Sequence, residues 1–365
     1  MANIRIRRLV REDIEEIDNL ICTREGISPG GASRRKEIME WIAFGNPFSN
    51  GATTYYVAES NGRIIGHLGR MPMEFMINGE LHKGFFPHDL YVHPEYRQKG
   101  MGFFVSMALY QALENETDSF CCNMWISPLN FRIQNRRGYY ELSFDKYVKL
   151  LNPYKEIIRF VRNKFLASVF TFIVKGIFNT LEFYLTRLNS SKLQITKIER
   201  FDRRFDALNQ KVSHKFDIIP SKRSDYLNWK YVDRPFSNFT RFAAEENGEV
   251  KGFLVSFLPK EEEYPTGIIL DILVDPDDKV TICALCKAVI DYFRLNNVHR
   301  IECLLSDKRL AKVLKKFLFL KRFETESITL VNWKKLVEKE SLVDRLNWHL
   351  TYGDSDGFMW KVCYS

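Results

Sequence analysis

One string of basic residues and glycines has the composition of an anion-binding turn: Val92-His93-Pro94-Glu95-Tyr96-Arg97-Gln98-Lys99-Gly100-Met101-Gly102. Backbone N–H groups that converge at the N-terminus of a helix bind phosphates, and the helix dipole adds to the attraction. Glycines let such a backbone approach the oxygens closely and adopt positive φ. Arg97 and Lys99 add positive charge. The string therefore predicts a site for a pyrophosphate.

Two side chains just before this string could move a proton. His88 and Asp89 are neighbours in the stretch 85–90, and an unperturbed imidazole titrates near neutral pH. His88 is therefore the first candidate for a general base. Strand alternation would turn Asp89 to the opposite face unless a bulge intervenes. The alternative that either residue only satisfies a local hydrogen bond stays open.

These side chains need a strand, a turn and a helix to position them. The pattern predicts a strand over 81–92, which Pro94 ends because proline cannot extend a ladder. After the turn at 97–102 we expect a helix to about residue 115, with Phe104, Met107, Ala108 and Leu113 on its apolar face. Further predicted elements are helices over 11–21, 34–44 and 128–136, and strands over 53–59, 63–71, 73–77, 119–126 and 141–150. Asn-Gly pairs at 61–62, 78–79 and 247–248 predict hairpin turns.

The second half of the chain has a similar predicted order of elements without the glycine turn. From residue 193 we expect a hairpin, a long strand, a helix, a strand, a short helix and a strand. The segment in the place of the turn contains Asp275, Asp277 and Asp278, whose charges would repel a pyrophosphate. We therefore expect a first domain over 1–150, a helical connector over 151–192 and a second domain over 193–365 that lacks the anion-binding loop.

The string V-x-P-x-Y-R-x-K-G-M-G resembles the acetyl-CoA signature of the GNAT superfamily of acyl-CoA N-acyltransferases, whose core is R/Q-x-x-G-x-G/A. The predicted element order over 1–150 is also similar to that family. The resemblance implies an α/β (α+β) GNAT fold, a mixed central sheet flanked by helices, followed by a degenerate GNAT-like domain. It also implies an acetyl-CoA-dependent N-acetyltransferase that acts on a primary amine of a small molecule, such as an amino sugar.

The same resemblance assigns roles to residues. It implies that the strand before the loop pairs with pantetheine, that the loop amides hold the pyrophosphate, and that the next strand, 120–125, diverges to leave a slot. The implied cofactor-binding residues are Leu90, Tyr91, Val92, Arg97, Gln98, Lys99, Gly100, Met101, Gly102 and Phe103. The candidate catalytic residues are His88 and Asp89.

The sequence departs from the family pattern at two places. Phe86 stands where a carboxylate is common, and Gln134 stands where a tyrosine acid often precedes the Gly138-Tyr139 pair by four residues. Tyr139 or Tyr140 could replace that acid. These departures leave two alternatives open, a catalytically inactive CoA-binding or scaffold protein, and a transferase with a longer acyl donor. The second rests on the apolar residues Phe85, Phe86, Met101, Phe103 and Phe104.

Two segments of the second half resemble parts of bacterial tandem-GNAT proteins. They are Tyr226-Leu-Asn-Trp229 and the segment 348–356, Trp-His-Leu-Thr-Tyr-Gly-Asp-Ser-Asp. Their aromatic and acidic side chains could hold a cationic amine. A solvated C-terminal turn is the other interpretation of the second segment.

Composition limits the partners. The chain has 365 residues and a net charge of +8, but no dense basic run with interleaved aromatics, so we expect no nucleic acid. Seven scattered cysteines, with Cys283-Ala-Leu-Cys286 standing alone, predict neither disulfides nor a metal site.

The first residues contain no apolar signal region, so we expect a cytoplasmic protein. Residues 155–188 read as mixed-character helix, which either bridges the domains or contacts a membrane surface peripherally. The oligomeric state is not predicted.

Overall fold

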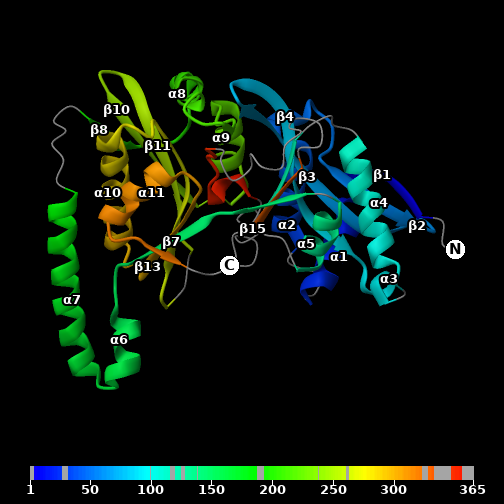
Figure 1. The fold of residues 1–365 in the computed structure, drawn as a ribbon. Helices are drawn as coiled ribbons and strands as arrows, with labels where there is room; N and C mark the ends of the chain where they lie inside the picture. The colour runs from blue at the N-terminus through cyan, green and yellow to red at the C-terminus, as the bar shows by residue number, and fades with distance from the viewer. Residues whose placement is uncertain are drawn as a thin grey trace. The chain divides into compact units, whose positions relative to one another are not determined.

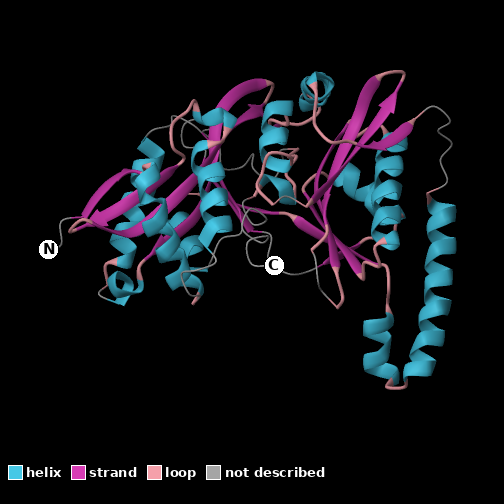
Figure 2. Cartoon of the chain, turned by 180° about the vertical axis from the view of Figure 1, so that it is seen from behind, coloured by secondary structure: helices cyan, strands magenta, loops and turns pink. Residues whose placement is uncertain are grey.

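The computed structural model describes residues 4–26, 32–98, 100–115, 120–124, 128–137, 139–186, 193–236, 238–259, 263–322, 328–332 and 347–355. The chain divides into two units whose segments alternate along the sequence. Unit 1 comprises residues 1–142, 225–237 and 328–346, and unit 2 comprises 143–224, 238–327 and 347–365. Helices lie against the strands in both units (Figures 1 and 2).

Unit 1 is built around a long hairpin. Strands β3 (Arg63–Ile77) and β4 (Glu80–Val92) are antiparallel and join at the turn Asn78-Gly79, where both residues have positive φ. The sheet order is β1-β2-β3-β4-β5-β15-β6, and β4 and β5 run parallel. The other elements are β1 (Ile4–Arg8), α1 (Ile14–Glu25), α2 (Ala32–Phe44), β2 (Tyr55–Ser60), α3 (Pro94–Gln98), α4 (Gly102–Asn115), β5 (Phe120–Met124), α5 (Pro128–Arg136), β6 (Tyr140–Ser143), α9 (Ser224–Tyr231) and β15 (Ile328–Asn332), with short 3-10 turns at Arg11–Asp13 and Pro47–Ser49.

Helix α4 covers one face of this sheet. Its buried residues Val105 and Leu109 pack in one cluster with Leu68 of β3 and with Phe85 and Val92 of β4. Along β4 the side chains of alternate residues point to the opposite face. The side chains of β4 that alternate with these core residues therefore lie on the face of the sheet away from α4.

Unit 2 has a second mixed sheet with a similar plan. Its order is β14-β7-β13-β12-β11-β10-β8, with β12 and β13 parallel and α10 connecting them. Helix α10 contributes Val289 and Phe293 to the core beneath it. The elements are β7 (Asp145–Leu150), α6 (Tyr154–Val161), α7 (Lys164–Leu185), β8 (Gln194–Lys197), α8 (Arg203–Ser213), β9 (Ile218–Pro220), β10 (Phe239–Glu246), β11 (Glu249–Phe257), β12 (Thr266–Val274), α10 (Lys279–Leu295), β13 (Arg300–Leu305), α11 (Lys308–Lys316), β14 (Leu320–Arg322) and a 3-10 turn at Tyr352–Asp354.

Each sheet includes a strand from the opposite half of the chain. In unit 1, β15 pairs with β5, so a strand from near residue 330 lies between β5 and β6. In unit 2, β7 pairs with both β13 and β14 and lies between them. The exchanged strand holds the same place in each sheet order, next to the second strand of the parallel pair.

The predicted α/β class with mixed sheets flanked by helices is confirmed, but the predicted boundaries differ from those of the structure. The strand expected over 141–150 is two strands, β6 and β7, in different sheets. The first unit therefore ends at Leu142 instead of residue 150. The connector expected over 151–192 groups with unit 2, and residues 225–237 and 328–346 of the expected second domain group with unit 1. The reason is the strand exchange, together with the packing of α9.

Candidate functional site

The predicted anion-binding loop joins two helices. Gly100 has φ +74°, and its amide donates to the carbonyl of Arg97 at 3.1 Å. The amide of Met101 donates to the carbonyl of Tyr96 at 3.0 Å. These two amides therefore hold the turn itself. The first-turn amides of α4, at residues 102–104, have no acceptor within the helix, as at every helix N-terminus, and they remain as anion donors. Lys99 lies outside the described residues.

Gly102 lets the two helices approach closely. A Cβ atom at this position would lie 3.0 Å from Cγ and 3.3 Å from Cα of Arg97. The guanidinium carbon of Arg97 lies 5.1 Å from the ring centroid of Tyr91 on β4. A cation is thus held between the end of β4 and the start of α4, where it adds to the positive helix terminus.

Strands β4 and β5 separate near this loop. In the described residues they pair only at Gly84–Phe120 and Phe85–Cys121. On its other edge β4 stays paired with β3, with Tyr91 opposite His67 and Val92 opposite Gly66. Residues 90–92 of β4 therefore lie beyond its described pairing with β5, at the place where an extended ligand could add alongside the strand. This is the divergence that the family resemblance implies.

A β-bulge brings Asp89 beside His88. Gly69 is opposite His88 and His67 is opposite Tyr91, so Leu68 faces two residues of β4. Asp89 takes φ +54°, a conformation that most residues avoid. Its carboxylate is buried, with Oδ2 3.6 Å from Nδ1 of His67. The bulge is therefore present, and it allows Asp89 and His88 to belong to one site.

His88 is buried next to a phenol. Tyr55, Gly69 and His88 lie in one row across β2, β3 and β4, and the hydroxyl of Tyr55 is 3.3 Å from Nδ1 of His88. The same hydroxyl is 3.4 Å from Oδ2 of Asp89. Among the described residues, Nε2 of His88 has no hydrogen-bond partner. This nitrogen is buried and faces Gly69 of the neighbouring strand.

Burial controls the charge of His88. Desolvation lowers its pKa to about 4, and the charges of His67 and Lys230 act in the same direction. The carboxylate of Asp89 and a hydrogen bond from the imidazole to the backbone of Arg70 oppose this shift. His88 is consequently a neutral imidazole at physiological pH, which is the form that can accept a proton.

Helix α9 carries residues from the second half of the chain into unit 1. Trp229 stacks on Trp41 with ring centroids 4.6 Å apart, and the hydroxyl of Tyr226 lies 3.4 Å from Sδ of Met71. Nζ of Lys230 lies 3.3 Å from the Tyr226 hydroxyl. The two aromatic residues that were expected to hold an amine are therefore core residues, whereas Lys230 brings a positive charge close to His88.

The tyrosine considered as a replacement acid is already engaged. The hydroxyl of Tyr139 lies 2.7 Å from Oε1 of Glu114 on α4 and 3.5 Å from Sγ of Cys121 on β5. Burial raises its pKa well above the usual value, and the neighbouring Cys121 and Glu114 raise it further. Tyr139 therefore joins α4 to β5. Gln134 is buried, and Gly138 lies outside the described residues.

Sequence reasoning missed three members of this cluster. Tyr55, His67 and Lys230 come from β2, β3 and α9, and they meet His88 and Asp89 only through the sheet register and the packing of α9. Tyr55 reaches His88 because both residues lie in the cross-strand row through Gly69, and no local sequence pattern reveals that row. For Lys230 the one available signal is its position next to Trp229 in a segment already of interest.

The equivalent place in unit 2 is filled by the chain itself. Strands β12 and β13 pair only up to Ile269–Cys303, and β12 also has a bulge, with Asp271 opposite Val255 and Ile269 opposite Ser256. Residues 347–355 lie along the separated end of β13, where Thr351 bridges Leu305. Unit 2 therefore has a divergence like that of unit 1 with its own segment against it.

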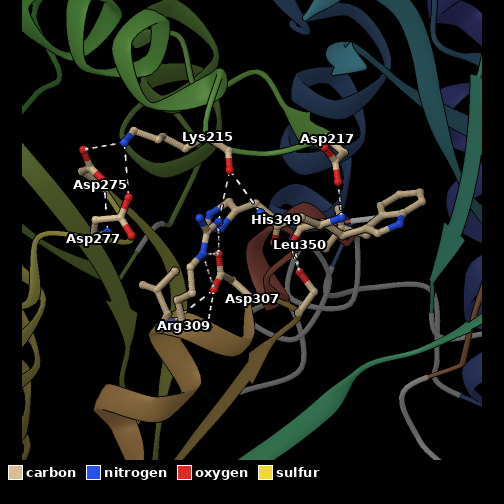
Figure 3. A network of polar contacts seen from close by, with 12 residues as sticks. Lys215, Asp217, Asp275, Asp277, Asp307, Arg309, His349 and Leu350 are labelled. Carbon is tan, nitrogen blue, oxygen red and sulfur yellow. Dashed lines mark hydrogen bonds and ion pairs between the residues drawn. The ribbon is translucent and has the colours of Figure 1, made fainter. Parts of the chain in front are cut away.

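Polar contacts hold this segment firmly (Figure 3). The amide of Asn347 donates to Oδ2 of Asp217 at 2.6 Å, and the amide of Leu350 donates to Oγ of Ser306 at 2.7 Å. Nε2 of His349 lies 2.8 Å from the carbonyl oxygen of Ile272 on β12 and donates to it. Such a set of contacts is typical of a permanent part of the fold.

A buried lysine joins the segment to the sheet. Nζ of Lys222 lies 3.0 Å from Oδ2 of Asp271 and 2.5 Å from Oδ1 of Asp354. These two carboxylates raise the pKa of Lys222 against the effect of its burial. Thr351 Oγ1 also donates to Asp271 at 3.2 Å. Asp354, proposed from the sequence as a group for a cationic amine, is thus used by Lys222, and Asp356 lies outside the described residues.

The helix that follows β12 differs from α4 at its N-terminus. Oδ1 of Asp278 accepts a hydrogen bond from the amide of Thr281 at 3.0 Å, so the chain caps α10 itself. Asp275 and Asp277 stand nearby. A negative cap in place of glycines explains why this end of unit 2 does not offer the anion site of unit 1.

Comparisons with known proteins agree with this geometry. The family model of the GNAT acetyltransferase domain matches residues 5–142. A GCN5-related N-acetyltransferase from Anabaena variabilis superimposes with a TM-score of 0.63 at 10% identity, covering 90% of this chain and 72% of that one. A probable N-acyltransferase from Enterococcus faecalis gives a TM-score of 0.60 at 12% identity and covers 92% and 74%.

A third solved structure carries a different acyl group. Saccharomyces cerevisiae N-myristoyltransferase with bound myristoyl-CoA gives a TM-score of 0.55 at 12% identity and covers 91% of this chain and 82% of that one. At these identities the solved structures show a common fold. No curated protein matches the chain in sequence. The family match, which includes the loop and the diverging strands described above, shows that residues 5–142 form an acetyltransferase domain of the GNAT type.

Proposed function

We propose that unit 1 binds acetyl-CoA and transfers its acetyl group to a primary amine of a small molecule. The observation that carries this proposal is the divergence of β4 from β5 after the pair Phe85–Cys121, close to the loop that leads into the N-terminus of α4. A long thioester cofactor with a pyrophosphate needs these two features next to each other. Arg97 supplies the additional positive charge.

The donor would be held by backbone groups more than by side chains. The first-turn amides of α4 and Arg97 would bind the pyrophosphate, and pantetheine would lie along β4 at residues 90–92. When bound, the cofactor supplies an activated acyl group. The role of this chain is then to orient that group and to manage the proton of the attacking amine.

His88 is the proposed base, in its neutral form. The amine nitrogen would form a bond to the acyl carbon, the carbon–sulfur bond would break with its electron pair leaving on the sulfur as the CoA thiolate, and the proton lost by the amine would move to the imidazole of His88, directly or through water. Asp89 favours the resulting imidazolium because its charge raises the pKa of His88. Phe86, which stands at the usual acid position, packs on Phe75 with centroids 5.6 Å apart and takes no part.

Unit 2 would act as a CoA-free companion domain with a GNAT-like strand order. Residues 347–355 lie against the divergence of β12 and β13, and Asp278 caps the helix that follows β12. Both features oppose the binding of a second cofactor. Through α9 the second half of the chain contributes Lys230 to the surroundings of His88.

A longer acyl donor is the second candidate. The apolar residues on which this candidate rests differ in exposure. Phe85 and Phe86 are buried in the core of unit 1, whereas Phe103 and Phe104 are exposed at the start of α4. Exposed aromatics beside a cofactor site could contact a longer chain. A series of acyl-CoA donors from acetyl to myristoyl, compared by kcat/KM, distinguishes the two candidates.

Calorimetric titration of acetyl-CoA tests the donor site, with two matched glycine variants. Gly100→Ala and Gly79→Ala both place a Cβ at positive φ with no atom within 4 Å, so both should cost about 1 kcal/mol of stability. Only Gly100→Ala should weaken acetyl-CoA binding, by about tenfold or more. Equal affinity of the two variants, or no binding by the wild type, would contradict the proposed site.

Turnover on a panel of amines tests the chemistry separately. Wild type should release CoA with at least one amine, and His88→Gln should retain acetyl-CoA affinity while kcat falls by about 10²–10⁴-fold. Binding without turnover on any amine would instead favour the scaffold alternative. Unchanged turnover in His88→Gln would exclude His88 as the base.

A further inference from the structure

The helical hairpin of α6 and α7 exposes an unusual amount of apolar surface. Of the most apolar 18-residue stretch of α7 only 17% is buried, although its length and composition would allow it to cross a membrane. In Figure 1 the hairpin extends beyond the edge of the sheet of unit 2. Exposed large apolar residues of the hairpin are Phe160, Phe165, Leu166, Val169, Phe170, Phe172, Ile173, Ile177, Phe178, Leu181, Phe183, Tyr184 and Leu185.

These residues surround most of α7. At 100° per residue, the exposed apolar side chains of α7 cover roughly 240° of the helix circumference. Thr171, Lys175 and Glu182 lie in the remaining sector. A helix that packs on one protein partner needs an apolar stripe of little more than about 100°. An environment that is apolar on several sides therefore fits this helix better than a single partner helix.

The charged residues in the outer part of the hairpin, between Glu156 and Glu182, are all basic. Residues 157–181 contain four basic residues, Arg159, Arg162, Lys164 and Lys175, and no Asp or Glu. Three of them lie around the turn between α6 and α7, beside the exposed rings of Phe160 and Phe165. Basic and aromatic side chains together at an exposed tip are the combination that anionic lipid surfaces attract. The same charges would repel a second copy of the hairpin.

The base of the hairpin is fixed to unit 2. Glu182 near the end of α7 pairs with Nζ of Lys149 at 2.7 Å and with Nη2 of Arg294 at 2.9 Å. On α6, Oε1 of Glu156 lies 3.1 Å from Nε2 of His299. These contacts hold the two helix ends nearest the sheet, so the exposed tip is presented on a rigid support.

The topology excludes a complete crossing of the bilayer. The strands on either side of the hairpin, β7 and β8, belong to the same sheet, so both ends of the hairpin must stay on one side. Helix α6 has eight residues, about 12 Å, which is far short of the ~30 Å hydrocarbon core. An inserted hairpin must therefore enter and leave through the same leaflet.

We propose that the α6–α7 hairpin inserts its tip into one leaflet of an anionic lipid bilayer and holds the protein at the membrane surface. Phe160, Phe165 and Phe172 enter the acyl-chain boundary, and Arg159, Arg162 and Lys164 contact the lipid headgroups. This proposal is independent of the acyl-transfer site, and neither test depends on the outcome of the other.

Co-sedimentation of the full chain with vesicles tests the proposal. At 150 mM NaCl, vesicles of phosphatidylcholine with 30% phosphatidylglycerol should bind the protein at least about tenfold more strongly than phosphatidylcholine alone, since each basic residue near an anionic surface contributes about 1 kcal/mol. Hydrogen exchange measured with and without the anionic vesicles should show new protection confined to residues 157–178. Failure to pellet with anionic vesicles would overturn the proposal.

Two pairs of variants separate the apolar and the electrostatic parts. Phe160→Ser with Phe172→Ser removes two side chains that are 86% and 81% exposed, and its control, Leu295→Ser with Leu320→Ser, removes two elsewhere in unit 2 that are 84% and 73% exposed. Arg159→Gln with Lys164→Gln is compared in the same way with Lys312→Gln and Lys315→Gln on α11. Only the hairpin variants should lose vesicle binding, by about tenfold or more, with an unchanged thermal midpoint.

Light scattering tests the alternative that the apolar surface of the hairpin binds a second copy of the chain. If the wild type forms a dimer that Phe160→Ser with Phe172→Ser dissociates, while neither protein binds vesicles, then the apolar surface serves a second copy of the chain and the membrane proposal is wrong. Equal loss of vesicle binding in the hairpin and the control variants would also contradict it.

Discussion

The hydroxyl of Tyr55 lies 3.3 Å from Nδ1 of His88, although strand β3 separates their strands. The contact is possible because the residue between them in the cross-strand row is Gly69, and the two rings meet edge to face, 5.1 Å apart, over its missing side chain. A Cβ atom at Gly69 would lie 2.4–2.8 Å from three atoms of the His88 ring. Gly69 therefore sets the position of the proposed base.

Substitution of Gly69 should disturb both stability and activity. In Gly69→Ala the imidazole must move, which we expect to cost about 1–3 kcal/mol and to lower kcat by tenfold or more. Gly176→Ala on α7 is the control, because nothing lies within 4 Å of its Cβ position. The control should keep full activity and gain up to about 1 kcal/mol. Urea unfolding and turnover of the two proteins check this, and equal behaviour would contradict the role of Gly69.

The low pKa of His88 gives acyl transfer a definite pH dependence. If transfer needs the neutral imidazole, kcat/KM should show no loss attributable to His88 from pH 8 down to about pH 5, and should fall as pH approaches 4. Asp89→Asn should move this limb to still lower pH, because the carboxylate raises the pKa of His88. A limb near pH 6.5 in the wild type would show that His88 is solvated in the working enzyme.

The same group makes stability depend on pH. In the folded protein the pKa of His88, about 4, lies below the ordinary histidine value of 6.5, so the unfolded chain binds more protons between these pH values. The stabilisation of the folded state that follows from this pKa difference is fully present above pH 6.5. It is lost as pH falls toward 4, by at most about 3 kcal/mol. Chemical unfolding at several pH values should show a shallower slope in His88→Gln than in the wild type.

Replacement of Lys222 should destabilise unit 2 strongly. Lys222→Met leaves Asp271 and Asp354 buried without their shared cation, at a cost of about 3–5 kcal/mol. Lys251→Met breaks an exposed pair with Glu249 and should change the stability little. A loss of similar size in both variants would show that the buried network contributes little.

The elements that local chemistry determines could be predicted from the sequence. Asn78-Gly79 and Asn247-Gly248 form the expected turns with positive φ at both residues, and α4 begins at Gly102 after the glycine turn. The proposed base and its bulged neighbour were also identified in advance, because a histidine and an aspartate before such a loop are few enough to name. Their roles await the experiments above.

The features that depend on distant pairing could not be predicted. The stretch 140–150 reads as one strand, and only the pairing of Tyr147 with Cys303, far along the chain, separates β7 from β6. In the same way, Lys230 reaches the surroundings of His88 through the stacking of Trp229 on Trp41. Such contacts are set by the registers of whole sheets, which a window of sequence does not contain.

The exchange of β7 and β15 has a consequence for synthesis. As the nascent chain leaves the ribosome, the first sheet lacks the strand between β5 and β6 until residue 332 has emerged. Until then the edge of β5 that will pair with β15 stays exposed, and open strand edges can pair with other chains. The first sheet is therefore completed only after the strand near residue 330 has been made, and a fragment of residues 1–142 would leave that edge open.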